Sequence, residues 1–185
     1  MIKKTYLWAA LVLLMASCKT SQRADLGDGL FADIKTSHGD IIVKLEHEKT
    51  PVTVANFISL AEGNNPFVSE QFKGKKYYDG LTFHRVIPNF VVQGGCPDGT
   101  GAGGPGYSID CELDGDNQYH DRGVLSMAHA VRNTGGSQFF ICHSRDNTAH
   151  LDRNHTVFGK VVEGEEVIDD IRQGTKIEKI TINES

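Results

Sequence analysis

Short apolar segments separated by glycine-rich turns make up most of the chain after residue 30. Segments 31–36 and 40–45 flank Ser37-His38-Gly39, which predicts a hairpin of two strands. Further apolar runs predict strands near 81–87, 90–95, 107–112, 124–129, 138–142, 156–162 and 176–183. Runs of this length, bounded by turn residues, are typical of a mainly β protein.

Two segments have helical features. Thr50 and Pro51 predict the start of a helix, with Thr50 as the N-cap and Pro51 in the first helical position. Gly63 predicts its end. One apolar face lies between them, formed by Val54, Phe57, Ile58 and Ala61. Segment 163–173, which Gly174 follows, predicts a second short helix. Many strands with a helix near each end favour a closed barrel, because closure removes the sheet edges.

The first 29 residues differ from the rest of the chain. Lys3 and Lys4 precede an apolar run from residue 6 to residue 16. This run is too short to span a bilayer as a helix, but it has the length of a signal-peptide core. Small residues then precede Cys18, which resembles the lipobox of bacterial lipoproteins. We predict a lipoprotein signal peptide at 1–17, acylation of Cys18, a tether at 18–29 and one domain at 30–185. The alternative is an ordinary secretory signal with an incidental cysteine.

Composition narrows the classes of function. A chain of 185 residues with 39% hydrophobic and 23% charged residues is an ordinary globular protein. Its net charge of -5 argues against nucleic-acid binding, which needs a basic surface. Cys96 and Cys111 flank a glycine-rich segment, so both a disulfide and free thiols stay open for an exported protein. No CxxC or HxxxH motif supports a metal site, and we expect none.

The run Phe83-His84-Arg85-Val86-Ile87-Pro88-Asn89-Phe90-Val91-Val92-Gln93-Gly94-Gly95 carries the strongest chemical signal. Side chains alternate along a strand, so Phe83, Arg85 and Ile87 are predicted on one face. Val91 and Gln93 are predicted on one face of the next strand. A guanidinium beside aromatic rings suits a site that holds an apolar ligand and polarises one atom of it. The alternative is a surface arginine that lies over a sheet.

Two further segments, at 123–141 and 151–161, identify a family. They contain Gly123-Val124-Leu125-Ser126-Met127-Ala128-His129-Ala130, Gly135-Gly136-Ser137-Gln138-Phe139-Phe140-Ile141 and Leu151-Asp152-Arg153-Asn154-His155. With the run at 83–95, they resemble the cyclophilin family of peptidyl-prolyl isomerases over residues 30 to 182. Long motifs in the same order are far more specific than one short pattern. The resemblance implies a closed eight-stranded antiparallel β-barrel capped by two α-helices, and an isomerase without a cofactor.

The resemblance also implies roles for residues. Arg85 would be the catalytic donor to the peptide. The proline pocket would be formed by Phe90, Val91, Phe140 and Leu151, with His155 at its rim. The flanking peptide would be held by Gln93, Ala128, His129 and Ala130, and Gln138 would join the polar network near Arg85. No Ser-His-Asp arrangement is evident in the sequence.

Three positions depart from the commoner family residues. His129 stands where many members have Asn, and Val91 stands where Met is more usual. His150 stands where the drug-sensitive members have Trp, which predicts weak inhibition by cyclosporin with activity retained.

Together these features predict a monomeric peptidyl-prolyl cis-trans isomerase that acts on proline-containing peptides and unfolded proteins. The leader places it in the cell envelope, held to a membrane by its lipid anchor and facing the periplasm or the exterior, where exported proteins fold. The alternatives are a non-catalytic proline-peptide binding module of the envelope and a passive scaffold.

Overall fold

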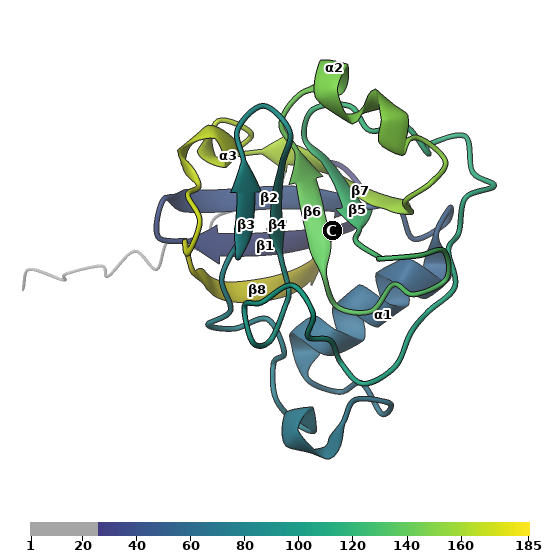
Figure 1. Cartoon of the computed structure of the whole chain (residues 1–185), viewed down its shortest axis with the longest axis vertical. Helices are drawn as coiled ribbons and strands as arrows, with labels where there is room; N and C mark the ends of the chain where they lie inside the picture. The colour runs from purple at the N-terminus through teal and green to yellow at the C-terminus, as the bar shows by residue number, and fades with distance from the viewer. Residues whose placement is uncertain (1–25) are drawn as a thin grey trace, which may run out of the picture.

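A sheet of eight antiparallel strands organises the part of the chain that the computed structural model describes, residues 26–185 (Figure 1). The order of the strands across the sheet is β3-β4-β6-β5-β7-β2-β1-β8. Their bounds are β1 Leu30–Thr36, β2 Gly39–Leu45, β3 Arg85–Ile87, β4 Val91–Gly94, β5 Val124–Met127, β6 Phe139–Cys142, β7 Val157–Glu163 and β8 Ile177–Glu184. The hairpin predicted at the start of the domain is confirmed, with Thr36 paired to Gly39 across its turn.

The predicted strand at 107–112 is wrong. Only Ile109 pairs there, in an isolated bridge in which its N–H donates to the carbonyl of Gly135 at 2.8 Å. The segment is held by its side chains instead. The hydroxyl of Tyr107 donates to Asn56, and the carboxylate of Glu112 accepts hydrogen bonds from the start of helix α1 (Pro51–Glu62).

The eight antiparallel strands are confirmed, but the expected closure of the barrel is wrong, because the sheet is open with β3 and β8 at its two ends. β3 has only three residues, and Phe83 just before it is fully buried in the core. The irregular backbone at 80–83 meets residues 174–177 through an isolated bridge, Thr82 with Lys176, and through backbone hydrogen bonds such as that from the N–H of Phe83 to the carbonyl of Thr175 at 2.9 Å. The sheet therefore curls into a half-barrel whose end strands approach each other without a continuous ladder.

Of the two expected helices, the first is confirmed and the second is much shorter than expected. α1 ends at Gly63, whose positive φ of 78° is a conformation that glycine adopts without strain. The helix predicted at 163–173 is only the single turn α3 (Val167–Asp170), because Ile171 is extended and its side chain is buried. Two short turns follow β6, α2 (Arg145–Thr148) and the 3₁₀ helix η2 (Ala149–Leu151), and another 3₁₀ helix, η1, spans Glu70–Phe72. No helix within residues 26–185 is long and apolar enough to cross a membrane.

Side chains are buried on both faces of the central strands. On the inner face, Phe57 of α1 packs against the rings of Tyr78 and Phe139, with centroids 5.1 and 5.6 Å away. Alternate residues of β4 and β6 point to the opposite face. There a second apolar cluster is formed by Val91, Val124, Phe140, Cys142, Leu151 and Val157. This outer cluster lies beneath the turns α2 and η2 and forms the base of the candidate site.

The two ends of the domain lie side by side. Gly29 and Ser185 exchange backbone hydrogen bonds, each 3.1 Å long, and the hydroxyl of Ser185 donates to Gly27. The predicted signal peptide, Cys18 and most of the predicted tether lie outside the described residues.

Candidate functional site

Sheet register places the site's chemistry in one row. Arg85 on β3 pairs with Gln93 on β4, Gln93 pairs with Phe140 on β6, and Phe140 pairs with Ser126 on β5. Directly paired residues point to the same face of a sheet. A cation, an amide, an aromatic ring and a hydroxyl therefore lie side by side on the outer face, one from each of four strands that neighbour one another in the sheet.

A cavity of about 640 Å³ opens over this row. Every residue predicted for the site lines it: Arg85, Phe90, Val91, Gln93, Ala128, His129, Ala130, Gln138, Phe140, Leu151 and His155. They come from segments up to 70 positions apart, so the fold brings together residues that only the resemblance connected. Their roles in binding and turnover stay predictions.

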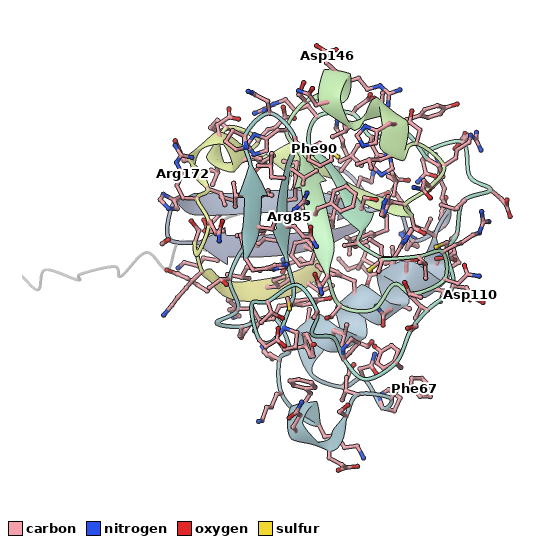
Figure 2. All side chains as sticks on the ribbon, in the orientation of Figure 1. Phe67, Arg85, Phe90, Asp110, Asp146 and Arg172 are labelled. Carbon is pink, nitrogen blue, oxygen red and sulfur yellow. The ribbon has the colours of Figure 1, made fainter. Side chains whose placement is uncertain are left out.

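Arg85 is held from behind by a chain of amides. Its Nη1 donates to Gln93 Oε1 at 3.1 Å, and Gln93 Nε2 donates to Gln138 Oε1 at 3.0 Å. Gln138 Nε2 in turn donates to the carbonyls of Gly101 and Gly103, both at 2.8 Å. The guanidinium lies over the ring of Phe90, with its Cζ 5.8 Å from the centroid. Both residues are labelled in Figure 2. Arg85 is exposed, so its other N–H groups can donate to a ligand in the cavity.

The expected grouping of Phe83 with Arg85 is wrong. Phe83 is buried on the inner face, while Arg85 and Ile87 are exposed on the outer face. The strict alternation begins only at Arg85, because β3 itself begins there. The irregular backbone before Arg85 lets an aromatic ring enter the core two residues before a guanidinium that reaches the cavity.

The apolar end of the cavity is well packed. Val91, Phe140 and Leu151 are buried members of the outer cluster, and Phe90 packs against them. His155 meets Phe140 edge to face, with the ring centroids 5.5 Å apart. Such a hollow suits a small apolar ring, because nothing in its wall demands a hydrogen bond from the ligand.

Two stacked imidazoles form one wall. The rings of His129 and His155 lie 4.0 Å apart at 22°. His155 Nδ1 donates to the carbonyl of Met127 at 3.1 Å, and His129 Nε2 donates to the carbonyl of Asn154 at 2.8 Å, which fixes each tautomer. Burial, with a smaller contribution from the neighbouring His129, lowers the pKa of His155 to about 4. His155 is therefore uncharged at neutral pH.

A buried polar chain lies under Phe140, which sequence reasoning missed. The ring of His120 stacks on Phe140 with centroids 5.8 Å apart. Its Nδ1 lies 3.3 Å from Asp152 Oδ1 and its Nε2 lies 2.9 Å from Ser126 Oγ. This Asp-His-Ser order resembles a hydrolytic triad, but Ser126 is fully buried and its hydroxyl donates to Thr156. The chain therefore supports the cavity from below and offers no accessible nucleophile.

Arg145 completes this support. Its two terminal nitrogens donate to the two oxygens of Asp152, both at 2.7 Å, and this bidentate hydrogen bonding lowers the pKa of Asp152 to about 2. Burial lowers the pKa of His120 to about 4. Asp152 directly follows Leu151, so the same carboxylate anchors both the buried imidazole and one wall of the apolar hollow.

The glycine-rich segment is the other part of the site that sequence reasoning missed. The cavity is also lined by Gly101, Ala102, Gly103, Gly104, Pro105, Tyr107 and Ser108. The sequence showed this stretch only as a loop, and its glycines were the one available signal. Backbone carbonyls, which every residue carries, make its contacts with Gln138, so no side-chain pattern marks them.

Cysteines and candidate metal ligands add nothing to the site. Cys96 and Cys111 are free, so the disulfide that the sequence left open is absent from the structure. Cys96 Sγ is 2.9 Å from Asp98 Oδ1, and the N–H of Asn133 donates to Cys111 Sγ. Across residues 26–185, no group of three histidine, cysteine or acidic side chains is arranged to hold a metal ion.

Comparison with known proteins gives a consistent result. The sequence pattern described as cyclophilin type peptidyl-prolyl cis-trans isomerase matches residues 31–184. A peptidyl-prolyl cis-trans isomerase of Helicobacter pylori is 46% identical over 163 residues, which are 87% of this chain and 91% of that protein. Peptidyl-prolyl cis-trans isomerase B of Bacillus subtilis is 50% identical over 139 residues, 75% of this chain and 87% of its own.

Solved structures agree with the sequence relatives. A cyclophilin type peptidyl-prolyl cis-trans isomerase of Cryptosporidium parvum, crystallised in the presence of the dipeptide Ala-Pro, superposes with a TM-score of 0.71. The two are 31% identical, and the match covers 84% of this chain and 99% of the other.

Proposed function

The chain belongs to the cyclophilin family of peptidyl-prolyl cis-trans isomerases, and we propose that it catalyses the cis-trans isomerisation of X–Pro bonds with Arg85 as the catalytic donor. The observation that carries the proposal is the position of Arg85. Its guanidinium lies over Phe90 at the edge of the apolar hollow, and Gln93 fixes it there.

The chemistry requires no covalent step. Rotation about an X–Pro bond is opposed by a barrier of about 18–20 kcal/mol, because resonance ties the nitrogen lone pair to the carbonyl. In the twisted state the nitrogen becomes pyramidal and its lone pair becomes basic. A donor fixed beside that nitrogen stabilises the twisted state more than either planar state, which is the condition for catalysis. Arg85 is permanently charged and offers several N–H groups in one plane.

The remaining residues would hold the substrate. The prolyl ring would pack against Phe90, Phe140 and Leu151, which leaves the acyl side of the bond free to rotate. Gln93 and the backbone at Ala128, His129 and Ala130 would hold the flanking peptide. The chain of amides from Gln93 through Gln138 to Gly101 would keep Arg85 from moving away as the bond rotates. The guanidinium would then already be oriented before the substrate binds, and no reorganisation would be needed during the reaction.

Substitution of Arg85 tests the proposal. Arg85→Ala should lower kcat/KM for a proline tetrapeptide about a hundredfold, since loss of one preorganised donor costs about 3 kcal/mol. Arg85→Lys should also be impaired, because an ammonium cannot reproduce the planar arrangement of donors. The measurement is a protease-coupled assay of cis-to-trans turnover.

Two controls accompany this assay. Arg132→Ala removes another exposed arginine that does not line the cavity, and it should leave turnover unchanged. Binding of the tetrapeptide to folded Arg85→Ala, followed by NMR shifts near Phe140, separates lost catalysis from lost binding. Full turnover by a folded Arg85→Ala protein would refute the role of Arg85.

We also propose that the enzyme works as a lipid-anchored monomer of the cell envelope on exported proteins. The support is the leader: Lys3 and Lys4, the apolar run and the small residues before Cys18. Two or more acyl chains give stable membrane anchoring. Mass spectrometry of the native N-terminal peptide should find Cys18 acylated and residues 1–17 removed. Cys18→Ala should release active enzyme from the membrane fraction. A native chain that still begins at Met1 would contradict this proposal.

A further inference from the structure

One exposed aromatic residue adjoins the cavity without belonging to it. Phe67 is 75% exposed, the largest exposed fraction among the large hydrophobic residues of the described chain. Its ring meets that of Tyr107 edge to face, with centroids 6.2 Å apart, and Tyr107 lines the cavity. The apolar surface of the cavity wall therefore continues outward across Tyr107 to Phe67, far from Arg85 and Phe90 in Figure 2.

The segment that carries Phe67 is firmly attached. The next residue, Val68, is buried in the inner core, so the two neighbouring side chains point in opposite directions. The N–H of Phe67 donates to Asn65 Oδ1 at 2.9 Å, and Asn65 Nδ2 donates to the hydroxyl of Tyr107 at 2.7 Å. The N–H of Ser69 donates to the carbonyl of Pro105 at 2.9 Å.

These contacts tie Phe67 to the cavity wall itself. Pro105 and Tyr107 belong to the wall, and each accepts a hydrogen bond from the segment around Phe67. The two loops touch so closely that a Cβ atom at Gly106 would lie 2.1 Å from Ser69 Oγ. An aromatic side chain held this way loses little conformational entropy when a ligand covers it.

We propose that Phe67 and Tyr107 form an accessory docking surface for an unfolded polypeptide whose proline occupies the cavity. This inference rests on the proposed function of the cavity. The occupant is an extended chain with an apolar side chain, preferably aromatic, several residues from the target proline. The continuity of the surface with the cavity argues for this occupant, because one extended chain can reach both.

The consequence is a length-dependent preference among substrates. A tetrapeptide fills the cavity and does not reach Phe67. A longer chain that places an aromatic ring against Phe67 gains a second contact, and an aromatic pair contributes enough to change affinity about fivefold. Phe67 thereby determines specificity without touching the rotating bond.

The experiment uses a series of long peptides, each with a single central proline and one tryptophan. The tryptophan is placed at a different distance from the proline in each peptide, on either side of it, and KM and kcat are measured for each. Each residue of separation shifts the ring by about 3.5 Å. The full-length wild type should show a minimum in KM at one position, about fivefold below the series average, with kcat unchanged. Phe67→Ala should abolish the minimum and keep wild-type turnover of the tetrapeptide.

Tyr119→Ala is the matched control, since Tyr119 is also an exposed aromatic residue, but its ring lies against the guanidinium of Arg153, which does not line the cavity. It should keep the minimum. If wild type and Phe67→Ala give the same profile while both turn over the tetrapeptide, the docking surface is refuted and the isomerase is not. If the wild type fails on the tetrapeptide, the proposed function itself fails. A Phe67-dependent dimer in sedimentation, with a flat peptide profile, would assign the surface to a second copy of the chain and overturn the proposal.

Discussion

His150 stands at the position where the family resemblance implies Trp in drug-sensitive cyclophilins. Its ring stacks on Phe90, with centroids 5.7 Å apart and an angle of 16° between the planes. An indole buries more apolar area than an imidazole and has an N–H that usually finds a partner when buried. His150→Trp should therefore tighten cyclosporin inhibition about tenfold or more, with little change in peptide turnover. An inhibition titration of both proteins checks this, and equally tight inhibition would show that position 150 does not govern the drug.

His120 and His155 make stability depend on pH. Burial lowers the pKa of each from 6.5 to about 4, so the unfolded chain binds more protons than the folded chain between these values. The free energy of unfolding should fall as pH falls from 6.5 towards 4, by at most about 1.4 kcal/mol per pH unit for each imidazole. The pKa of Asp152 is lowered to about 2, and its contribution is lost only below this window.

Urea unfolding at a series of pH values measures this dependence. His155→Gln removes one of the titrating groups and should reduce the slope between pH 4 and 6.5. It should not remove the slope, because burial also lowers the pKa of His84, His120 and His143. An unchanged slope in His155→Gln would contradict the buried, neutral state of this imidazole.

At the residue scale, every residue that the sequence predicted for the pocket does line the cavity, but the buried polar residues that support the pocket were not predicted. Arg85, Phe140 and Leu151 stand in long motifs, so the resemblance located them. His120 had no such signal, because a lone histidine before an apolar run looks the same whether it is buried or exposed. Its partner Asp152 is 32 positions away, and only the folded chain shows that both lie under Phe140.

At the scale of elements, Glu112 caps helix α1 from a distant loop. Its two carboxylate oxygens accept hydrogen bonds from the backbone N–H groups of Val52 and Thr53, at 3.1 and 2.8 Å. Thr50, the predicted N-cap, makes no capping bond with its side chain. Since a carboxylate at a helix N-terminus also interacts with the helix dipole, Glu112→Ala should lower the free energy of unfolding by about 1–2 kcal/mol.

Chemical denaturation of two variants checks the cap. Asp110→Ala removes an exposed carboxylate two residues away and should be nearly neutral. A loss in Asp110→Ala as large as that in Glu112→Ala would mean that charge in this loop, and not the cap, stabilises the helix.

The elements that sequence patterns misplaced share one cause. Segment 107–112 has strand-like composition, yet the carboxylate of Glu112 is hydrogen-bonded to the start of α1, and only Ile109 forms a β-bridge. Segment 163–173 has helical spacing, yet burial of Ile171 requires an extended backbone after α3. In both cases a contact with a remote part of the chain overrides the local preference. The first hairpin and α1 were predicted well because their turn, proline and glycine are all local.

At the scale of the whole molecule, the order of strands depends on pairings between remote segments. β8 lies beside β1, and β3 lies at the opposite end of the sheet. Periodicity predicts which residues form strands, but it contains no information on which strands pair. The resemblance supplied the antiparallel arrangement and the number of strands. The open edge between β3 and β8 follows from the shortness of β3, which no local pattern indicated.

The pairing of Gly29 with Ser185 means that the domain nearly forms a ring. A few flexible residues could join Ser185 to Gly27 without disturbing either strand, and new chain ends could be opened between the exposed Asp114 and its neighbour Gly115. Such a circular permutant would keep the row from Arg85 to Ser126 intact. The position of the chain ends could then be changed independently of catalysis, and a fused partner protein could be attached on the side of the 114–115 loop.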